Sequence, residues 1–230
     1  MIDQMDMMSV VQKYRGDAVV VPVERAAVAW PQVSAYPQRD VSPSVMGKAS
    51  SFALGLCLAQ PDTKVIVFDG DGSLEMNLGT LVTIANKPPQ NLYHFVLENG
   101  MYATTGGQPI PGKDKISFTA MAQAAGYAAA YDFDNLEDLA TKVERILTEP
   151  GPVLVCVKST PNPRLRGQRG QEMSGRRRTI SEAITELRRD LGVLYSEAGP
   201  SPAKRMPGKH GGRAWRCGPT WFVPIPRPPP

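Results

Sequence analysis

No uninterrupted apolar run in this 230-residue chain approaches the roughly 18 residues that a membrane-spanning helix needs, so we expect no membrane association. The amino terminus, MIDQMDMMSVVQKYRGD, lacks the basic stretch, apolar block and small-residue cleavage site of a secretion signal. Cysteine is scarce, and Cys57, Cys156 and Cys217 form no Cys-x-x-Cys pair. The first two lie in apolar segments, where buried reduced thiols are expected. Together these absences favour a soluble protein of the reducing cytoplasm.

The formal charge of +4 is unevenly distributed along the chain. Residues 1–157 carry 11 Lys and Arg against 17 Asp and Glu, a net charge of −6, whereas the remaining residues carry 15 against 5, a net charge of +10. Half of the prolines, 11 of 22, also follow Lys158. This change in composition predicts a domain at residues 1–160 and a basic, Pro-rich tail at residues 161–230.

The tail lacks the aromatic residues that stack on nucleic-acid bases in its most basic stretch, RLRGQRGQEMSGRRR, and it resembles no nucleic-acid-binding fold. Charge alone can hold phosphates, but a solvated, largely irregular extension is the simpler expectation and nucleic acid is an unlikely partner. One helix is expected at residues 179–192, capped by Thr179 or Ser181, because Ile180, Ile184, Leu187 and Leu191 form an apolar stripe. We expect that helix to dock on the domain or on another subunit.

Strand and helix patterns alternate through the first 160 residues. Apolar strands are expected at DAVVVPV, TKVIVF, LYHFVL, YAAAY and PVLVCVK, and helices at SVMGKASSFALGLCLAQ, SLEMNLGTLVTIAN, SFTAMAQAAG and NLEDLATKVERIL. Nearly continuous apolar strands are typical of sheets that are covered on both faces. The sequence therefore predicts an α/β fold with a doubly wound parallel sheet, whose ligands bind at the carboxyl ends of the strands.

The segment VIVFDGDGSLEMN admits two chemistries at such a strand end. In one, Asp69 is the nucleophile of a phosphatase of the haloacid dehalogenase type. That reading needs a later lysine and a further acidic pair at strand ends, and the late acidic cluster DFDNLED instead begins what reads as a surface helix. In the other, the aspartates serve a metal site, and Asp69 is a structural group.

The metal interpretation gains support from ENGMY, which follows the next strand. Asp71, Asn99 and the main-chain carbonyl of Met101 form a mixed oxygen set of the kind that Mg2+ uses beside substrate phosphates. Gly70 and Gly72 allow a ligand to approach the backbone, and the helix that begins at Ser73 offers free N–H groups to an anion. These features predict a diphosphate clamp.

The segments SVMGKASSFALGLCLAQ, VIVFDGDGSLEMNLGTLVTIA and NLYHFVLENGMYATTGGQ resemble the diphosphate-binding half of thiamine diphosphate-dependent 2-oxoacid decarboxylases. The likeness is strongest to the beta subunit of sulfopyruvate decarboxylase and to phosphonopyruvate decarboxylase. It covers roughly residues 10–158.

The resemblance implies a role for each matching residue. Asp71, Asn99 and the Met101 carbonyl would hold Mg2+, and Met46 would be the catalytic wedge that keeps the cofactor bent. The residues implied in binding thiamine diphosphate are Ser44, Met46, Gly47, Gly70, Asp71, Gly72, Ser73, Asn99, Met101 and Tyr102, and those on the substrate side are Thr104, Thr105 and Gln108. Glu24 and Arg25 follow the first strand but are left outside the expected site.

The family also uses a glutamate of a pyrimidine-binding domain, for which this chain has no room beside its single α/β unit. The resemblance therefore implies a partner, an alpha subunit that supplies the activating glutamate, and a small 2-oxoacid substrate. The loop ERAAVAWPQVSAYPQRDV departs from the family pattern, because it lacks the expected Gly and Ser-Arg residues, and Glu98 replaces the usual Asp or Asn. A carboligase of the acetolactate synthase type and a non-catalytic cofactor-binding module remain alternatives.

Overall fold

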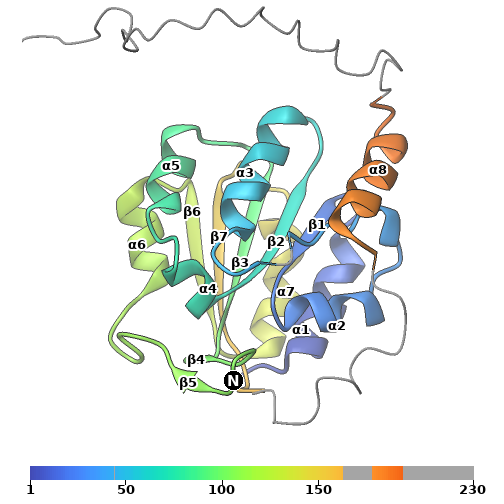
Figure 1. Ribbon diagram of the computed structural model, residues 1–230. Coiled ribbons are helices and arrows are strands. Elements are labelled where there is room, and N and C mark those ends of the chain that lie inside the picture. Colours follow the sequence, from blue (N-terminus) through green and yellow to red (C-terminus); the bar gives the residue numbers. More distant parts are fainter. Residues whose placement is uncertain (44, 163–177, 194–230) are drawn as a thin grey trace, which may run out of the picture. The chain divides into compact units, whose positions relative to one another are not determined.

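A five-stranded parallel sheet forms the centre of the computed structural model, which describes residues 1–43, 45–162 and 178–193 (Figure 1). The strands pair in the order β1-β2-β3-β7-β6. Their bounds are Val19–Pro22 for β1, Val65–Gly70 for β2, Leu92–Glu98 for β3, Ala129–Phe133 for β6 and Val153–Lys158 for β7. All four pairings are parallel, as the apolar strand patterns predict.

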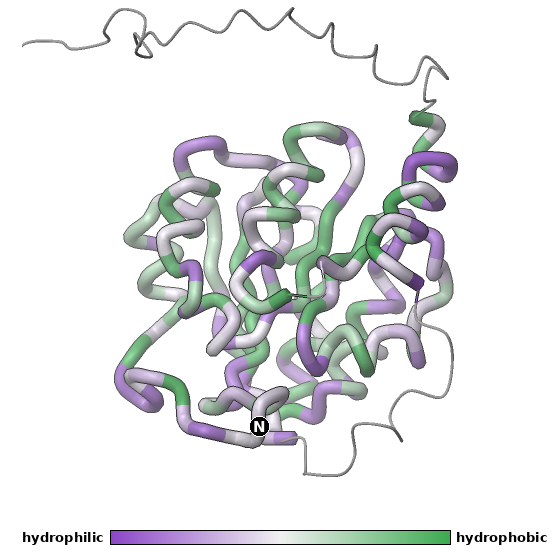
Figure 2. The backbone as a smooth tube through the Cα atoms, in the orientation of Figure 1, coloured by the Kyte–Doolittle hydropathy of each residue, from purple (hydrophilic) through white to green (hydrophobic). Residues whose placement is uncertain are grey.

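Helices cover both faces of the sheet, which makes the fold doubly wound. One face packs against α1 (Gln4–Tyr14), α2 (Ala26–Ala29) and α7 (Leu136–Ile146). The other packs against α3 (Ala49–Ala59), α4 (Asp71–Glu75), α5 (Thr80–Asn86) and α6 (Phe118–Ala125). Figure 2 shows the strands coloured largely as hydrophobic, whereas hydrophilic and hydrophobic residues alternate along several of the helices.

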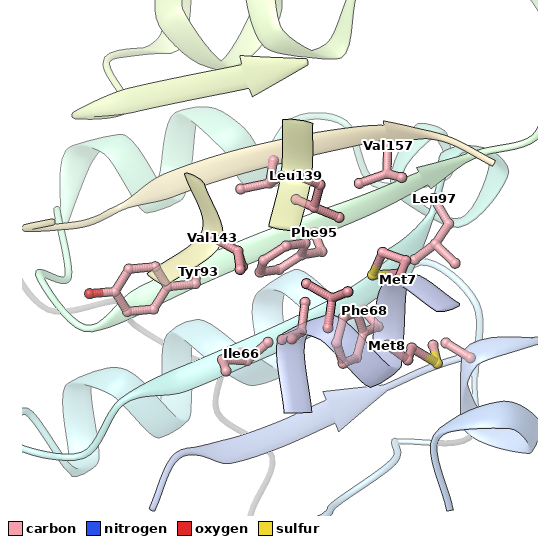
Figure 3. Packing of buried hydrophobic residues seen from close by; sticks show 14 of the residues in the cluster. Met7, Met8, Ile66, Phe68, Tyr93, Phe95, Leu97, Leu139, Val143 and Val157 are labelled. Carbon is pink, nitrogen blue, oxygen red and sulfur yellow. The ribbon is translucent and has the colours of Figure 1, made fainter. Parts of the chain in front are cut away.

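The core follows from the alternation of side chains along the strands. Phe68 and Phe95 point to the first face, where their rings lie 5.5 Å apart between Met7 of α1 and Val143 of α7 (Figure 3). Neighbouring strand residues, such as Val67 and Val96, point to the second face. Two buried apolar layers therefore hold the strand ends, and the turns that follow them, in fixed positions.

Two helices differ from the sequence prediction. The helix expected from Ser44 begins only at Ala49, because Gly47 adopts a positive φ of 71° that ends any continuous helix there. The helix expected at residues 73–86 is split into α4 and α5, with a break at Met76–Gly79. The two breaks contact each other, because the Nδ2 atom of Asn77 donates a hydrogen bond to the carbonyl of Gly47.

The turns after β2 and β3 lie together at one end of the sheet. The chain leaves β2 directly into α4, and leaves β3 into a small antiparallel hairpin of β4 (Met101–Tyr102) and β5 (Gln108–Pro109). Figure 1 shows α4 and this hairpin at the lower end of the sheet, near the amino terminus. The topology thus brings the two polar segments singled out in the sequence to the same edge.

The late helix is present as α8 (Ile180–Asp190), which begins with a capping box between Thr179 and Glu182. Ala183 and Leu187 pack with Val19 and Val41 beside β1. The helix therefore docks on the α/β domain and belongs to the same compact unit. No helix in the part of the chain that the structure describes is long and apolar enough to cross a membrane.

Candidate cofactor site

A small pocket, partly open to solvent, lies at the carboxyl ends of β1, β2 and β3. It collects most of the residues expected in the site, from three separate turns and the Met46 loop. The predicted residues that line it are Met46, Gly70, Asp71, Gly72, Ser73, Asn99, Met101, Tyr102 and Thr104. This is the position at which a doubly wound sheet binds ligands.

Asp71 is buried and is held by two backbone donors. Its Oδ1 atom accepts a hydrogen bond from the N–H of Gly72 at 2.8 Å, and its Oδ2 atom accepts one from the N–H of Gly100 at 2.6 Å. Burial raises the pKa of Asp71, and these backbone hydrogen bonds oppose the rise. A buried carboxylate with spare lone pairs at a pocket wall suits a cation.

Asn99 and Met101 contribute oxygens from the neighbouring turn. The Oδ1 atom of Asn99 accepts a hydrogen bond from the N–H of Met101 at 2.9 Å, which sets the orientation of the amide. The positive φ of Gly100, 73°, turns the chain between them. Asp71 and Asn99 are therefore joined through one short turn, and both face the same pocket.

Neighbouring side chains occupy the space that a side chain at Gly72 would need. A Cβ atom at this position would lie 2.5 Å from the Cε1 atom of Tyr102 and 3.0 Å from Ile110. The ring of Tyr102 thus packs directly over the Gly72 backbone, and burial, aided by the charges of Glu75 and Asp71, raises the pKa of its hydroxyl. The position admits only glycine without a shift of the hairpin.

Ser73 fixes the loop that carries Met46. Its hydroxyl accepts a hydrogen bond from the N–H of Gly47 at 3.0 Å, and the Nδ2 atom of Asn77 donates to the carbonyl of Gly47 at 3.0 Å. Gly47 therefore supports the pocket wall instead of lining the pocket, and Asn77 is a support that the sequence reasoning missed. Ser44 lies outside the described residues.

Two of the expected substrate-side residues do not line the pocket. Thr105 and Gln108 are exposed at the hairpin tip, where the Nε2 atom of Gln108 donates to the carbonyl of Thr105 at 3.2 Å. Thr104, in contrast, is one of the lining residues. Of the three expected substrate-side residues, only Thr104 lies at the pocket, and Thr105 and Gln108 are exposed on the hairpin.

Glu24 and Arg25, which the sequence analysis leaves outside the expected site, both line the pocket. Glu24 has a positive φ of 54°, which is uncommon for a residue other than glycine. It stands in the loop where the family pattern led us to expect a glycine. The backbone turn at Glu24 directs this loop to the pocket, and a glutamate in the sequence gives no sign of such a positive φ.

Asp69 is buried at the pocket floor next to a histidine. Its Oδ1 atom accepts a hydrogen bond from the N–H of Gly70, and its Oδ2 atom lies 3.5 Å from the Nε2 atom of His94, which is also buried. No lysine lines the pocket among the described residues. The arrangement therefore lacks the lysine that the phosphatase interpretation requires.

The donor set fits a hard divalent cation that a ligand helps to coordinate. Among the described residues, no three His, Cys, Asp or Glu side chains come together as a self-contained metal centre. Asp71, Asn99 and Met101 line the same pocket, so a Mg2+ ion held there would have few protein oxygens and would need phosphate oxygens to complete its shell. The Gly72 backbone itself is buried beneath Tyr102, and its N–H already donates to Asp71, so the expected open approach at this glycine is not present.

The fold and the pocket define a cofactor-binding α/β domain with its site at the carboxyl end of a parallel sheet. Residues 30–157 match the family model of the thiamine pyrophosphate enzymes, C-terminal TPP binding domain, and the chain belongs to this family.

Among curated proteins, the chain is 40% identical over 116 residues to a phosphonopyruvate decarboxylase of Streptomyces hygroscopicus, covering 50% of this chain and 28% of that protein. It is 43% identical over 116 residues to a sulfopyruvate decarboxylase subunit beta of Methanothermobacter thermautotrophicus, covering 50% of this chain and 59% of that protein. The chain thus matches only part of each relative.

Among solved structures, one described as a thiamin diphosphate-dependent enzyme from Mycobacterium smegmatis superposes with a TM-score of 0.61 at 20% identity, over 70% of this chain and 32% of that one. At this identity the likeness supports the fold alone.

Proposed function

We propose that this chain is the diphosphate-binding component of a thiamine diphosphate- and Mg2+-dependent 2-oxoacid decarboxylase of the sulfopyruvate or phosphonopyruvate type. The observation that carries the proposal is the meeting of Asp71, Asn99 and Met46 in one pocket at the carboxyl ends of the strands. Relatives that carry these activities in their names support the substrate class.

In this proposal, Asp71, Asn99 and the carbonyl of Met101 bind Mg2+, and the backbone at Gly72 and Ser73 contacts the diphosphate. When bound, thiamine diphosphate supplies the electron sink for decarboxylation. The chain's own task would be orientation: Met46, on the loop tied to Ser73 through Gly47, would contact the cofactor and hold its conformation.

The charges of the pocket support a role for a metal ion in this proposal. Its lining includes three carboxylates, Glu24, Asp69 and Asp71, but among the described residues only one cation, Arg25. A diphosphate would be repelled by such a wall. A divalent cation on Asp71 would offset the net charge of −2 on these four side chains, so that the pocket could accept an anionic cofactor.

We also propose a partner subunit that supplies the activating glutamate of a pyrimidine-binding domain. The match to a protein named as a subunit beta supports a two-chain enzyme. The isolated chain should then bind the cofactor weakly and release little aldehyde, whereas a mixture with an alpha subunit should be active. Full activity of this chain alone would contradict the split site.

Calorimetric titration with thiamine diphosphate tests the clamp. We expect binding that depends on Mg2+ and is lost in Asp71→Ala and in Asp71→Asn, which has nearly the same shape. Asp62→Ala removes an exposed acid and serves as the control. Equal binding with and without Mg2+, or an unaffected Asp71→Asn variant, would refute the proposed function.

A carboligase shares the same clamp, so the products decide between the two reactions. With pyruvate and a complete enzyme, a carboligase forms a new carbon–carbon bond, and a decarboxylase releases an aldehyde. A non-catalytic module would bind the cofactor without turnover beside any partner.

A further inference from the structure

Helix α8 lies outside the part of the chain that matches the family model, and it packs against the segment that leads to Met46. Leu187 of α8 is buried together with Val41. Residues 37–41 run beside β1, an edge strand of the sheet, and the N–H of Val41 donates to the carbonyl of Val20 at 2.9 Å. The helix therefore helps to hold residues 37–41 in place on the sheet.

Polar contacts at both ends of α8 join it to the same segment. Arg178, just before the helix, donates from its Nη2 atom to the carbonyl of Asp40 at 3.1 Å. Asp190, the last residue of the helix, accepts a hydrogen bond from the Nε atom of Arg39 at 2.5 Å. Residues 37–41 are thus bonded to α8 at two points that lie a helix length apart.

Met46 follows this segment closely and is anchored on its other side as well. The N–H of Gly47 donates to the hydroxyl of Ser73, and the carbonyl of Gly47 accepts a hydrogen bond from Asn77, both at 3.0 Å. Only four residues separate Met46 from the end of residues 37–41. Because so short a connection has little reach, the place of residues 37–41 limits where Met46 can lie.

The first turn of α8 also lies near the loop that carries Met46. Met46 lines the cofactor pocket, and together with Val45, Phe52 and Ile180 it lines a second, open groove. Ile180 is the first residue of α8, and the capping box that begins at Thr179 fixes the helix start there. The loop therefore separates the pocket from a groove that α8 helps to form.

We propose, resting on the proposed function, that α8 is a positioning element that holds Met46 against the thiamine part of the cofactor. The Mg2+ clamp does not depend on this helix, because hydrogen bonds within the turns after β2 and β3 hold Asp71 and Asn99. Loosening α8 should therefore weaken the binding of thiamine diphosphate but not that of inorganic pyrophosphate, which occupies the clamp alone.

The test compares these two ligands by calorimetry on the full chain, in the same excess of Mg2+. Arg178→Gln removes a surface contact of α8 with residues 37–41, and Leu187→Ala removes a buried one. Each variant should weaken thiamine diphosphate binding by about fivefold and leave pyrophosphate binding unchanged. Arg189→Gln, which removes an exposed positive charge from the same helix, is the control and should change neither affinity.

A double-mutant cycle shows whether α8 acts through Met46. Met46→Ala should weaken thiamine diphosphate binding selectively, and adding Arg178→Gln should cause little further loss, because the side chain that the helix positions is gone. Additive losses would overturn the proposal. Equal weakening of both ligands in Arg178→Gln, unchanged binding of both, or a wild-type chain that binds pyrophosphate as tightly as thiamine diphosphate would overturn it too. Arg178→Gln alone decides if Leu187→Ala does not fold.

Amide hydrogen exchange without ligand tests the same link independently of the cofactor. Arg178→Gln should speed exchange at the N–H of Gly47, which bonds to Ser73, and leave the N–H of Gly100, which bonds to Asp71, unchanged. Unchanged exchange at Gly47, or an equal increase at both amides, would overturn the proposal. A wild-type chain that binds neither ligand refutes the proposed function instead, and the exchange at Gly47 still shows whether α8 restrains this loop.

Discussion

The Oδ2 atom of Asp71 accepts a hydrogen bond from the backbone N–H of Gly100 at 2.6 Å and so ties the turn after β2 to the turn after β3. This contact joins residues that are 29 positions apart in the chain. It holds the carboxylate beside the Asn99 turn before any ligand arrives. A site prepared in this way loses little conformational freedom on binding.

Acidification should weaken Mg2+ binding at a higher pH than an ordinary aspartate would allow. Burial raises the pKa of Asp71 above the usual 3.8, so the carboxylate regains its proton sooner as the pH falls. Below that raised pKa, the Mg2+ association constant should fall by about tenfold per pH unit, because the ion competes with one proton. Titrations over a pH series, corrected for protonation of the free cofactor, measure this slope. An affinity that stays constant down to pH 3.8 would contradict the prediction.

Gly72→Ala should disturb the hairpin and the clamp together. The added methyl group would meet the ring of Tyr102 at 2.5 Å, so the ring must move, at a cost of about 1–3 kcal/mol in the free energy of unfolding. Urea unfolding and cofactor titration measure the two effects. Gly55→Ala is the matched control, since nothing lies within 4 Å of its Cβ position, and it should stabilise α3 by about 0.5–1 kcal/mol. Similar results for the two variants would argue against close packing over Gly72.

Glu24→Gly should relieve backbone strain beside Arg25. A non-glycine residue in the left-handed region costs about 1–2 kcal/mol, part of which the flexibility of glycine in the unfolded chain offsets. We expect the glycine variant to be more stable than Glu24→Ala by about 0.5–1 kcal/mol in urea unfolding. Because both variants lose the carboxylate, their difference reports on the backbone alone. A less stable glycine variant would show that this φ value carries no strain.

The buried Arg15 should be needed for folding as one half of an ion pair. Its Nη1 atom lies 3.1 Å from the Oδ1 atom of Asp40, and it also donates to Ser34 at 3.0 Å. Arg15→Met leaves the Asp40 carboxylate without its counter-charge and should cost about 3–5 kcal/mol in the free energy of unfolding. The double variant Arg15→Met with Asp40→Leu should recover much of the loss, which a double-mutant cycle measures. Additive losses would mean that the two residues act independently.

The main features of the fold could be predicted from the sequence, because the hydrophobic period of a strand or helix and its residue composition are local properties. The apolar runs TKVIVF and LYHFVL indicated buried parallel strands, and these strands are present as β2 (Val65–Gly70) and β3 (Leu92–Glu98). The Gly-Asp-Gly turn and the later Asn99 indicated a common edge. The structure brings Asp71 and Asn99 to one pocket, and the family model covers this region. Their ligand roles stay predictions until the titrations are made.

Other features depended on contacts between segments distant in the chain. Period alone did not reveal that the helix expected from Ser44 starts at Ala49, or that Gly47 is held by Ser73 and Asn77. The segment TTGGQ was expected to border the substrate as a whole. In the structure, Thr105 and Gln108 are joined by a hydrogen bond at the exposed end of the hairpin, away from the pocket. Arg25 and Glu24 enter the pocket because β1 pairs with β2, a choice of neighbour that no local pattern encodes.

The amino-acid sequence by itself determined the alternation of strands and helices and the polar residues at strand ends, since local propensity and hydrophobic period set both. Only the tertiary structure decided which of those ends meet, which glycine lies under an aromatic ring, and that, within the part of the chain that the structure describes, one arginine shares a pocket with three carboxylates. Strand order and side-chain packing are long-range properties, so they become visible only when the chain is folded.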